Sequence, residues 1–221
     1  MVIERKGLAM DSIAQGITFF KQGGIVMYFL AIASIFVVFI GIERAFYFAR
    51  ADAGRAFAHA FMLHIANARY AEALALARDQ RGAIADILFS AITKNSGRAD
   101  RMSAYMEIQS GIALSKMRRR IYYLSVIVTM APLLGLLGTI SGMITTFSVF
   151  NIQAGEPAAI TGGIGEALVA TATGLFVAIF SLVVHTYFAQ RLDVMLTLLE
   201  KTMNTVLAGF AAADGGKAHA S

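Results

Sequence analysis

The chain has 221 residues, of which 57% are hydrophobic and 15% are charged, and its mean hydropathy is +0.66. Soluble domains carry charge on about 25% of their residues, so this composition is typical of a membrane protein and argues against a soluble domain. The chain has no cysteine, which excludes disulfides and cysteine-ligated metal sites. Membrane topology explains the formal net charge of +5 better than binding to nucleic acid does.

The N-terminal part of the chain predicts a surface segment followed by a membrane span. Residues 1–23 contain the short amphipathic stretch "DSIAQGITFFK", which is expected to lie on the outer surface of the membrane, and Met10 is an alternative start. Residues 24–42 are uncharged and close to the ~20 apolar residues that cross a bilayer. This first span shows no division into a small and a bulky side, so we expect it to face lipid.

Residues 43–120 carry only helical signals. In "RYAEALALARDQ" and "GAIADILFSAITKN", apolar residues recur at three- and four-residue spacing. Breaks are expected at Gly82 and at 95–97. From Asp100 the helical pattern continues into the next apolar segment, which predicts one helix of about 50 residues and roughly 75 Å.

Two more membrane spans are predicted at 121–150 and 164–190, joined by a loop at 151–163. The chain then continues as a C-terminal helix and tail, 191–221, in which "AAADGGKAHAS" is expected to be disordered. The loop has no Lys or Arg, whereas the second span is directly preceded by Lys116, Arg118, Arg119 and Arg120. Positive charge marks the cytoplasmic side, so we expect 43–120 and the C-terminus inside, and the N-terminus and the loop outside.

The second and third spans each have one side of small or hydroxylated residues. In "APLLGLLGTISGMITTF", such residues fall within roughly 80° of Gly135 on a helical wheel, and bulky residues fall on the other side. The third span repeats this division. The candidate residues are Gly135, Gly138, Gly142, Thr145 and Thr146 in the second span, and Ala170, Gly174, Ala178 and Ser181 in the third. They favour either close helix packing or the lining of a lumen in a ring of identical subunits.

Two ionisable side chains lie near the ends of the third span. Glu166 is at the outer end, where a carboxylate is also favoured by the helix dipole. His185 is near the inner end, where it could equally be a hydrogen-bonded interfacial histidine. The mid-span hydroxyls, such as those of Thr139 and Thr171, do not titrate near neutral pH. A proton path would therefore need a carboxylate from a partner helix.

The paired motifs "APLLGLLGTISGMITTF" and "GIGEALVATATGLFVAI", together with the segment "ALALARDQRGAIADILFSAI", resemble the TolQ/ExbB branch of the MotA/TolQ/ExbB proton-channel family. The resemblance covers most of 24–205. It implies a proton-path role for Thr139 in the "GLxGT" motif, and for Glu166 and Thr171 in "EALxAT". The sequence departs from the branch at Phe180, where a proline is usual, and at His185-Thr186.

The resemblance implies an all-α, three-span protein of the bacterial inner membrane that forms a ring of five subunits. The ring would surround a dimer of a single-span ExbD/TolR-like partner, and proton flow would energise a TonB- or TolA-like protein. A passive scaffold that anchors an ExbD-like protein and a self-contained ion channel are the alternatives. The sequence shows no nucleophile–base pair, phosphate loop or metal cluster, so neither an enzyme nor a cofactor is expected.

Overall fold

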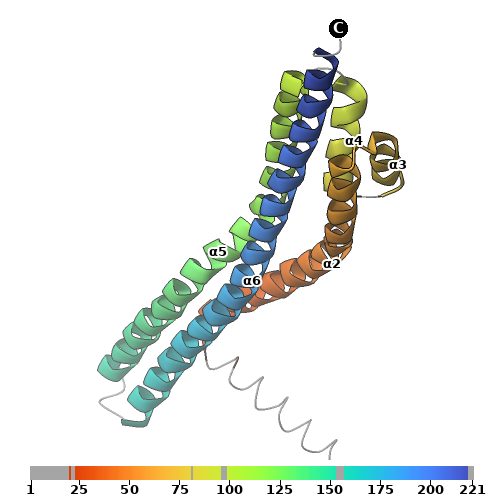
Figure 1. The fold of residues 1–221 in the computed structure, drawn as a ribbon. Coiled ribbons are helices and arrows are strands. Elements are labelled where there is room, and N and C mark those ends of the chain that lie inside the picture. The colour runs from red at the N-terminus through yellow and green to blue at the C-terminus, as the bar shows by residue number, and fades with distance from the viewer. Residues whose placement is uncertain (1–19, 21–22, 81, 96–98, 153–156, 219–221) are drawn as a thin grey trace, which may run out of the picture. The chain divides into compact units, whose positions relative to one another are not determined.

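The computed structural model describes residues 20, 23–80, 82–95, 99–152 and 157–218, and all regular elements in these ranges are helices. This confirms the all-α prediction. The helices are α2 (Val26–Ala66), α3 (Tyr70–Asp79), α4 (Ala83–Asn95), α5 (Ala99–Ile152) and α6 (Pro157–Ala218) (Figure 1).

Three of these helices, α2, α5 and α6, contain stretches long and apolar enough to cross a membrane. The stretches are Val26–Ala49, Asp100–Ser148 and Gly162–Ala211. The predicted amphipathic segment at 1–23 lies almost entirely outside the described residues.

The long helix predicted from Asp100 is confirmed, because α5 runs for 54 residues without a break. The expected interruptions also hold: α4 begins directly after Gly82, whose φ is +155°, and it ends at Asn95. The chain therefore leaves the helical path where glycine removes the cost of an unusual backbone angle.

Two expectations about non-helical segments were wrong. The tail expected to be disordered from Ala211 is helical as far as Ala218, because its alanines are the strongest helix formers. The loop expected at 151–163 is also shorter, because α5 continues to Ile152 and α6 starts at Pro157. Proline is favoured at the first position of a helix, where its missing N–H costs nothing.

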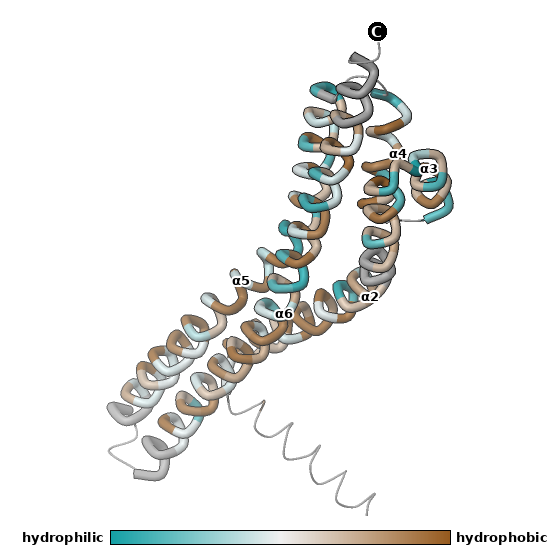
Figure 2. The backbone as a smooth tube through the Cα atoms, in the orientation of Figure 1, coloured by the Kyte–Doolittle hydropathy of each residue, from teal (hydrophilic) through white to brown (hydrophobic). Residues whose placement is uncertain are grey.

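The chain divides into two compact units, and the first comprises Met1–Ile40 and Tyr122–His185. Here the beginning of α2 packs against α5 and α6 through Val26, Met27 and Leu30, which contact Ala131 and Val177. The opposite side of α2 exposes large apolar residues: Tyr28, Phe29, Ile32, Ile35, Phe36, Val38 and Phe39. Hydrophobic residues dominate these segments in Figure 2. An apolar outer surface of this kind is what contact with lipid requires.

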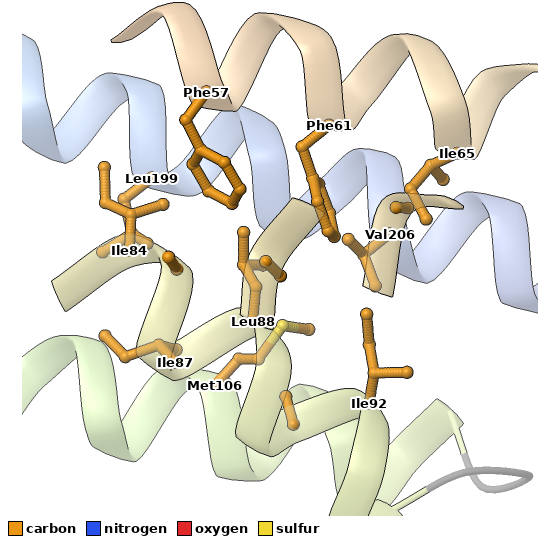
Figure 3. Close-up of a cluster of buried hydrophobic side chains, with 14 of the residues drawn as sticks. Phe57, Phe61, Ile65, Ile84, Ile87, Leu88, Ile92, Met106, Leu199 and Val206 are labelled. Carbon is orange, nitrogen blue, oxygen red and sulfur yellow. The ribbon is translucent and has the colours of Figure 1, made fainter. Parts of the chain in front are cut away.

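The second unit comprises Gly41–Ile121 and Thr186–Ser221, and it has a core of its own. Phe57, Phe61 and Ile65 of α2 meet Leu88 of α4 and Val206 of α6 in this core (Figure 3). Tyr70 of α3 donates a hydrogen bond to the Gly209 carbonyl over 2.8 Å. In Figure 2 the hydrophilic residues gather mainly in this unit.

Methionine side chains fill part of the second unit's core. Met102 and Met106 of α5 are completely buried. Ser110 donates a hydrogen bond to the Met106 carbonyl (2.6 Å), and its oxygen also lies 3.2 Å from the Met203 sulfur. Flexible thioethers of this kind fill irregular gaps between helices.

A buried arginine lies near one end of the second unit. The Arg44 side chain is 4% exposed, and its Nη2 contacts the Glu43 carboxylate at 3.3 Å. Arg120 pairs with the same carboxylate. The Nε and Nη1 of Arg44 have no hydrogen-bond partner among the described residues, while its guanidinium stacks over Tyr47 at 4.8 Å. Glu43 is thus the anion between two guanidinium groups.

Candidate functional site

The candidate site is built on the close approach of α5 and α6 in the first unit. A Cβ added at Gly174 would lie 2.6 Å from the Ala131 carbonyl oxygen and 2.9 Å from the Gly135 Cα. A Cβ added at Gly135 would lie 3.1 Å from the Thr171 Cα. Because these neighbours are backbone atoms, only glycine allows the two helices to come this close.

The same pattern continues along both helices. A Cβ at Gly142 would lie 3.1 Å from the Ala167 Cβ, and a Cβ at Gly138 would crowd Ala170 and lie 3.7 Å from Val26. The predicted small sides of α5 and α6 therefore face each other within one chain. Of the two alternatives for these glycines, their contacts in the structure are those of helix packing.

Two hydroxyls connect the helices by hydrogen bonds. Thr171 Oγ1 of α6 donates to the Gly135 carbonyl of α5 over 2.9 Å. Ser181 Oγ, which is fully buried, donates to the Leu124 carbonyl over 3.1 Å. Ala178 is buried between these two levels. The polar groups of this seam thus satisfy backbone carbonyls of the neighbouring helix.

The threonines of α5 donate to their own helix instead. Thr139 Oγ1 donates to the Leu136 carbonyl (2.6 Å), and Thr145 Oγ1 donates to that of Ser141 (3.0 Å). Thr146 is buried, packs beside Gly163 and donates to Gly142 over 2.8 Å. Of the three, only Thr146 is fully enclosed within the chain, while Thr139 is half-buried and Thr145 is exposed.

Helix α2 covers one side of the α5–α6 pair and leaves the other side, which we name the uncovered side. On a wheel of about 100° per residue, Ile127 and Leu134 of α5, which pack against α2, lie on one flank of the helix contact, and Thr139 lies on the other. The same wheel places Val177 of α6 on the α2 flank and Thr171 on the uncovered flank. The two predicted proton-path threonines therefore share the uncovered side.

The two ionisable candidates lie at other levels of α6 than Thr171. Glu166 points toward the start of α2, because a Cβ added at Gly24 would lie 2.6 Å from its Oε1. Gly24 has a φ of +66°, which favours glycine. The structure thus brings Thr139 and Thr171 together, while Glu166 is on the α2 flank. His185 is half-buried, one helical turn beyond Ser181.

The bulky residues of both helices point away from the seam. The exposed ones include Leu133, Leu136, Leu137, Ile140, Met143, Ile144 and Phe147 on α5, and Leu168, Leu175, Phe176, Ile179, Phe180, Leu182 and Val183 on α6. This separation agrees with the division read from the sequence. The described residues contain no group of His, Cys, Asp and Glu that could hold a metal ion.

Comparison with known proteins gives these motifs a family. The model of the MotA/TolQ/ExbB proton channel family matches residues 79–201, which include the seam, Thr139 and Thr171. The chain belongs to this family. It is therefore a membrane protein of a proton channel family, with three long apolar helices.

Several relatives in this family carry transport-system names. The chain is 34% identical over 170 residues to biopolymer transport protein ExbB-like 1 of Synechocystis, covering 75% of this chain and 67% of that protein. It is 37% identical to biopolymer transport protein ExbB of Neisseria gonorrhoeae, covering 42% and 45% of the two chains. Identity to Tol-Pal system protein TolQ of Pseudomonas aeruginosa is 32%, with 37% and 36% covered. The matched part thus spans about two thirds of the first relative and less than half of the others.

Three features of the site were missed in the sequence. Ser125 and Thr129 add hydroxyls to the uncovered side, and Pro132 interrupts the hydrogen bonding of α5 between these and Thr139. The signal was present as two hydroxyls four residues apart, just before a proline, in an uncharged helix. The position of Gly24 beneath Glu166 had no such signal, because nothing in the sequence links residues so far apart.

Proposed function

We propose that this family member is the proton-conducting subunit of an ExbB–ExbD or TolQ–TolR type complex in the bacterial inner membrane. It would form a ring, five-fold as the resemblance implies, about a dimer of an ExbD/TolR-like single-span protein. Proton flow would energise a TonB- or TolA-like partner. The N-terminus and the segment between α5 and α6 would be periplasmic, and residues 43–120 and the C-terminus cytoplasmic.

One observation carries this proposal: α2 leaves one side of the α5–α6 pair uncovered, and Thr139 and Thr171 lie on that side. In a ring with α2 outside, against lipid, this side faces inward. Because the glycine seam leaves no room between α5 and α6, the conducting space belongs to the assembly and not to one chain.

The same side explains the need for a partner. Between Tyr122 and His185 the sequence has two acidic residues, Glu156 and Glu166. Glu166 is on the α2 flank, and Glu156 lies outside the described residues. Hydroxyl groups can hydrogen-bond to water that carries a proton, but they do not themselves become protonated near neutral pH. The partner helix would therefore supply the carboxylate that takes up the proton.

Proton uptake tests the proposal. The chain is co-purified with an ExbD/TolR-like single-span protein and reconstituted in liposomes that contain a pH-sensitive dye. Thr139→Val with Thr171→Val should abolish proton uptake in a complex that still assembles, and Thr171→Ser should retain it. Thr173→Val is the matched control, because Thr173 donates to its own helix, at the Val169 carbonyl over 2.8 Å, and lies on the α2 flank of the α6 wheel. The chain alone should not conduct, so uptake without the partner would favour a self-contained channel.

The passive scaffold is the second candidate, and the Thr171–Gly135 hydrogen bond favours it. In a scaffold, this bond between α6 and α5 would be the whole task of Thr171. Full proton uptake by the double variant would support the scaffold and overturn the proton path.

A further inference from the structure

The uncovered side carries polar groups well beyond Thr139. On the α5 wheel, Ser125, Thr129, Pro132 and Thr139 fall within about 80° of one another. Thr129 is exposed and Ser125 is half-buried, although both are in the uncharged part of the helix. At 1.5 Å per residue, the set extends for roughly 20 Å along α5.

Pro132 adds a backbone acceptor to this set. Proline has no N–H, so the Val128 carbonyl lacks the donor that residue 132 would otherwise provide. A carbonyl without a donor is costly in lipid, and prolines are tolerated in membrane helices where water or another group satisfies it. The free carbonyl points toward position 132, which is on the uncovered side.

The hydroxyls on this side present acceptors and not donors. Ser125 Oγ donates to the Tyr122 carbonyl (2.8 Å), and Thr129 Oγ1 donates to that of Val126 (2.9 Å). Thr139 Oγ1 likewise donates to its own helix. A hydroxyl has one donor and two acceptor lone pairs. Because the donor of each of these hydroxyls is already used, only acceptor lone pairs remain for a water molecule or an ion that binds here. Such a surface binds water and hydrated cations through their hydrogens, and it disfavours anions.

Polar residues of α6 lie beside both ends of this row of α5 residues, which runs from Ser125 to Thr139. Thr171 sits at the level of Gly135, between Thr139 and Pro132, because it donates to the Gly135 carbonyl. Ser181 is held at the level of Leu124, beside Ser125, and His185 follows one turn later. Histidine is the side chain that most readily exchanges protons near neutral pH. The polar groups thus lead toward an ionisable group at their inner end.

We propose that Thr129, Ser125 and the free Val128 carbonyl form an acceptor track that carries hydrated protons from Thr139 and Thr171 to His185. This track rests on the proposed function and extends it, since it names the inner half of the path. It also assigns a task to Pro132, which is to expose a carbonyl to the water of the track.

The test uses the reconstituted complex and dye described above. Ser125→Ala with Thr129→Val should lower the rate of proton uptake at least five-fold, and Ser125→Thr with Thr129→Ser should restore it. The matched control is Ser148→Ala with Thr173→Val, because both of these hydroxyls also donate to their own helices and lie off the uncovered side. This control should stay within two-fold of the unchanged protein.

Pro132→Ala provides an independent arm, which also serves if the double variant fails to assemble. Alanine restores the N–H to the Val128 carbonyl and should slow proton uptake several-fold, although removing a proline from a helix favours the helix itself. A purely structural proline would not combine slower uptake with equal or higher thermal stability.

The outcomes separate the two proposals. Normal uptake by both the Ser125/Thr129 variant and Pro132→Ala, with loss in the Thr139/Thr171 variant, overturns the track and leaves the proposed function standing. Normal uptake in the Thr139/Thr171 variant overturns both. Uptake should be the same in sodium-free and sodium-containing medium, and a sodium requirement would overturn the assignment of the track to protons.

Discussion

At the residue scale, the glycines of the seam act through their lack of a Cβ. Among the seam glycines whose added Cβ would meet backbone atoms, Gly174 has the least space. Its Cβ would press on the Ala131 carbonyl oxygen and on the Gly135 Cα. Neither neighbour is a flexible side chain that could turn away. The separation between α5 and α6 is therefore set by backbone atoms.

Gly174→Ala should destabilise the protein by about 1–3 kcal/mol, because the added methyl group forces the two helices apart. Gly165→Ala is the control, since nothing lies within 4 Å of its added Cβ, and alanine favours a helix. Thermal unfolding in detergent measures both variants. Equal midpoints would show that the seam is looser than described.

Another residue-scale consequence concerns the carboxylate between Arg44 and Arg120. Glu43→Gln would leave the buried Arg44 without its anion, which is much costlier than the loss of an exposed pair. The unfolding midpoint should fall by roughly 3–6 °C. Glu72→Gln is the comparison, because Glu72 is 54% exposed, so its contacts with Arg69 (3.3 Å) and His64 (3.0 Å) contribute little. Similar midpoints for the two variants would contradict the role given to Glu43.

At the scale of the helices, the seam is also fixed by hydrogen bonds between α5 and α6. Ser181→Ala removes the fully buried donor to the Leu124 carbonyl and should cost about 1 kcal/mol. Ser148→Ala should cost almost nothing, because Ser148 is exposed and donates only to its own helix. Thermal unfolding in detergent resolves the difference, and equal loss in both variants would rule out a special role for the interhelical bond.

The helices themselves could be predicted well. Apolar spacing gave α3 and α4, the lack of charge gave the membrane spans, and uninterrupted periodicity gave the whole of α5. The direction of the small sides could not be predicted. A wheel shows that Gly135, Gly138 and Gly142 share a side, but it does not show whether that side meets α6 of the same chain or a lumen.

The candidate site was predicted in part for the same reason. Thr139 and Thr171 were found from their motifs, and the structure adds that both lie off the α2 flank. Ser125 and Thr129 were overlooked because they precede the motif. The burial of Arg44 depends on contacts between helices far apart in sequence, and a local pattern carries no information about these.

At the scale of the whole molecule, the chain consists of two units with different bases of stability. The first unit depends on close backbone approach and an apolar outer surface, whereas the second has a conventional side-chain core. Leu88 is fully buried at the centre of that core (Figure 3). Large-to-small changes there leave a cavity that the surrounding helices do not fill.

Leu88→Ala should therefore destabilise the second unit by roughly 2–5 kcal/mol. Leu63→Ala should have little effect, because Leu63 is 61% exposed on α2. Limited proteolysis detects the difference, since cleavage at the lysines and arginines of α3–α5 should accelerate only in the Leu88 variant. Unchanged cleavage in both variants would show that the core contributes less than its burial suggests.

The methionines of the second unit have a chemical consequence of their own. Met102 and Met106 lie in the same fully enclosed core as Phe61 and Leu88. Oxidation of either sulfur to the sulfoxide would place a strongly polar oxygen where only hydrocarbon surrounds it. Because both sulfurs are completely enclosed, the folded core itself shields them from oxidants, and oxidation becomes damaging only when this unit opens.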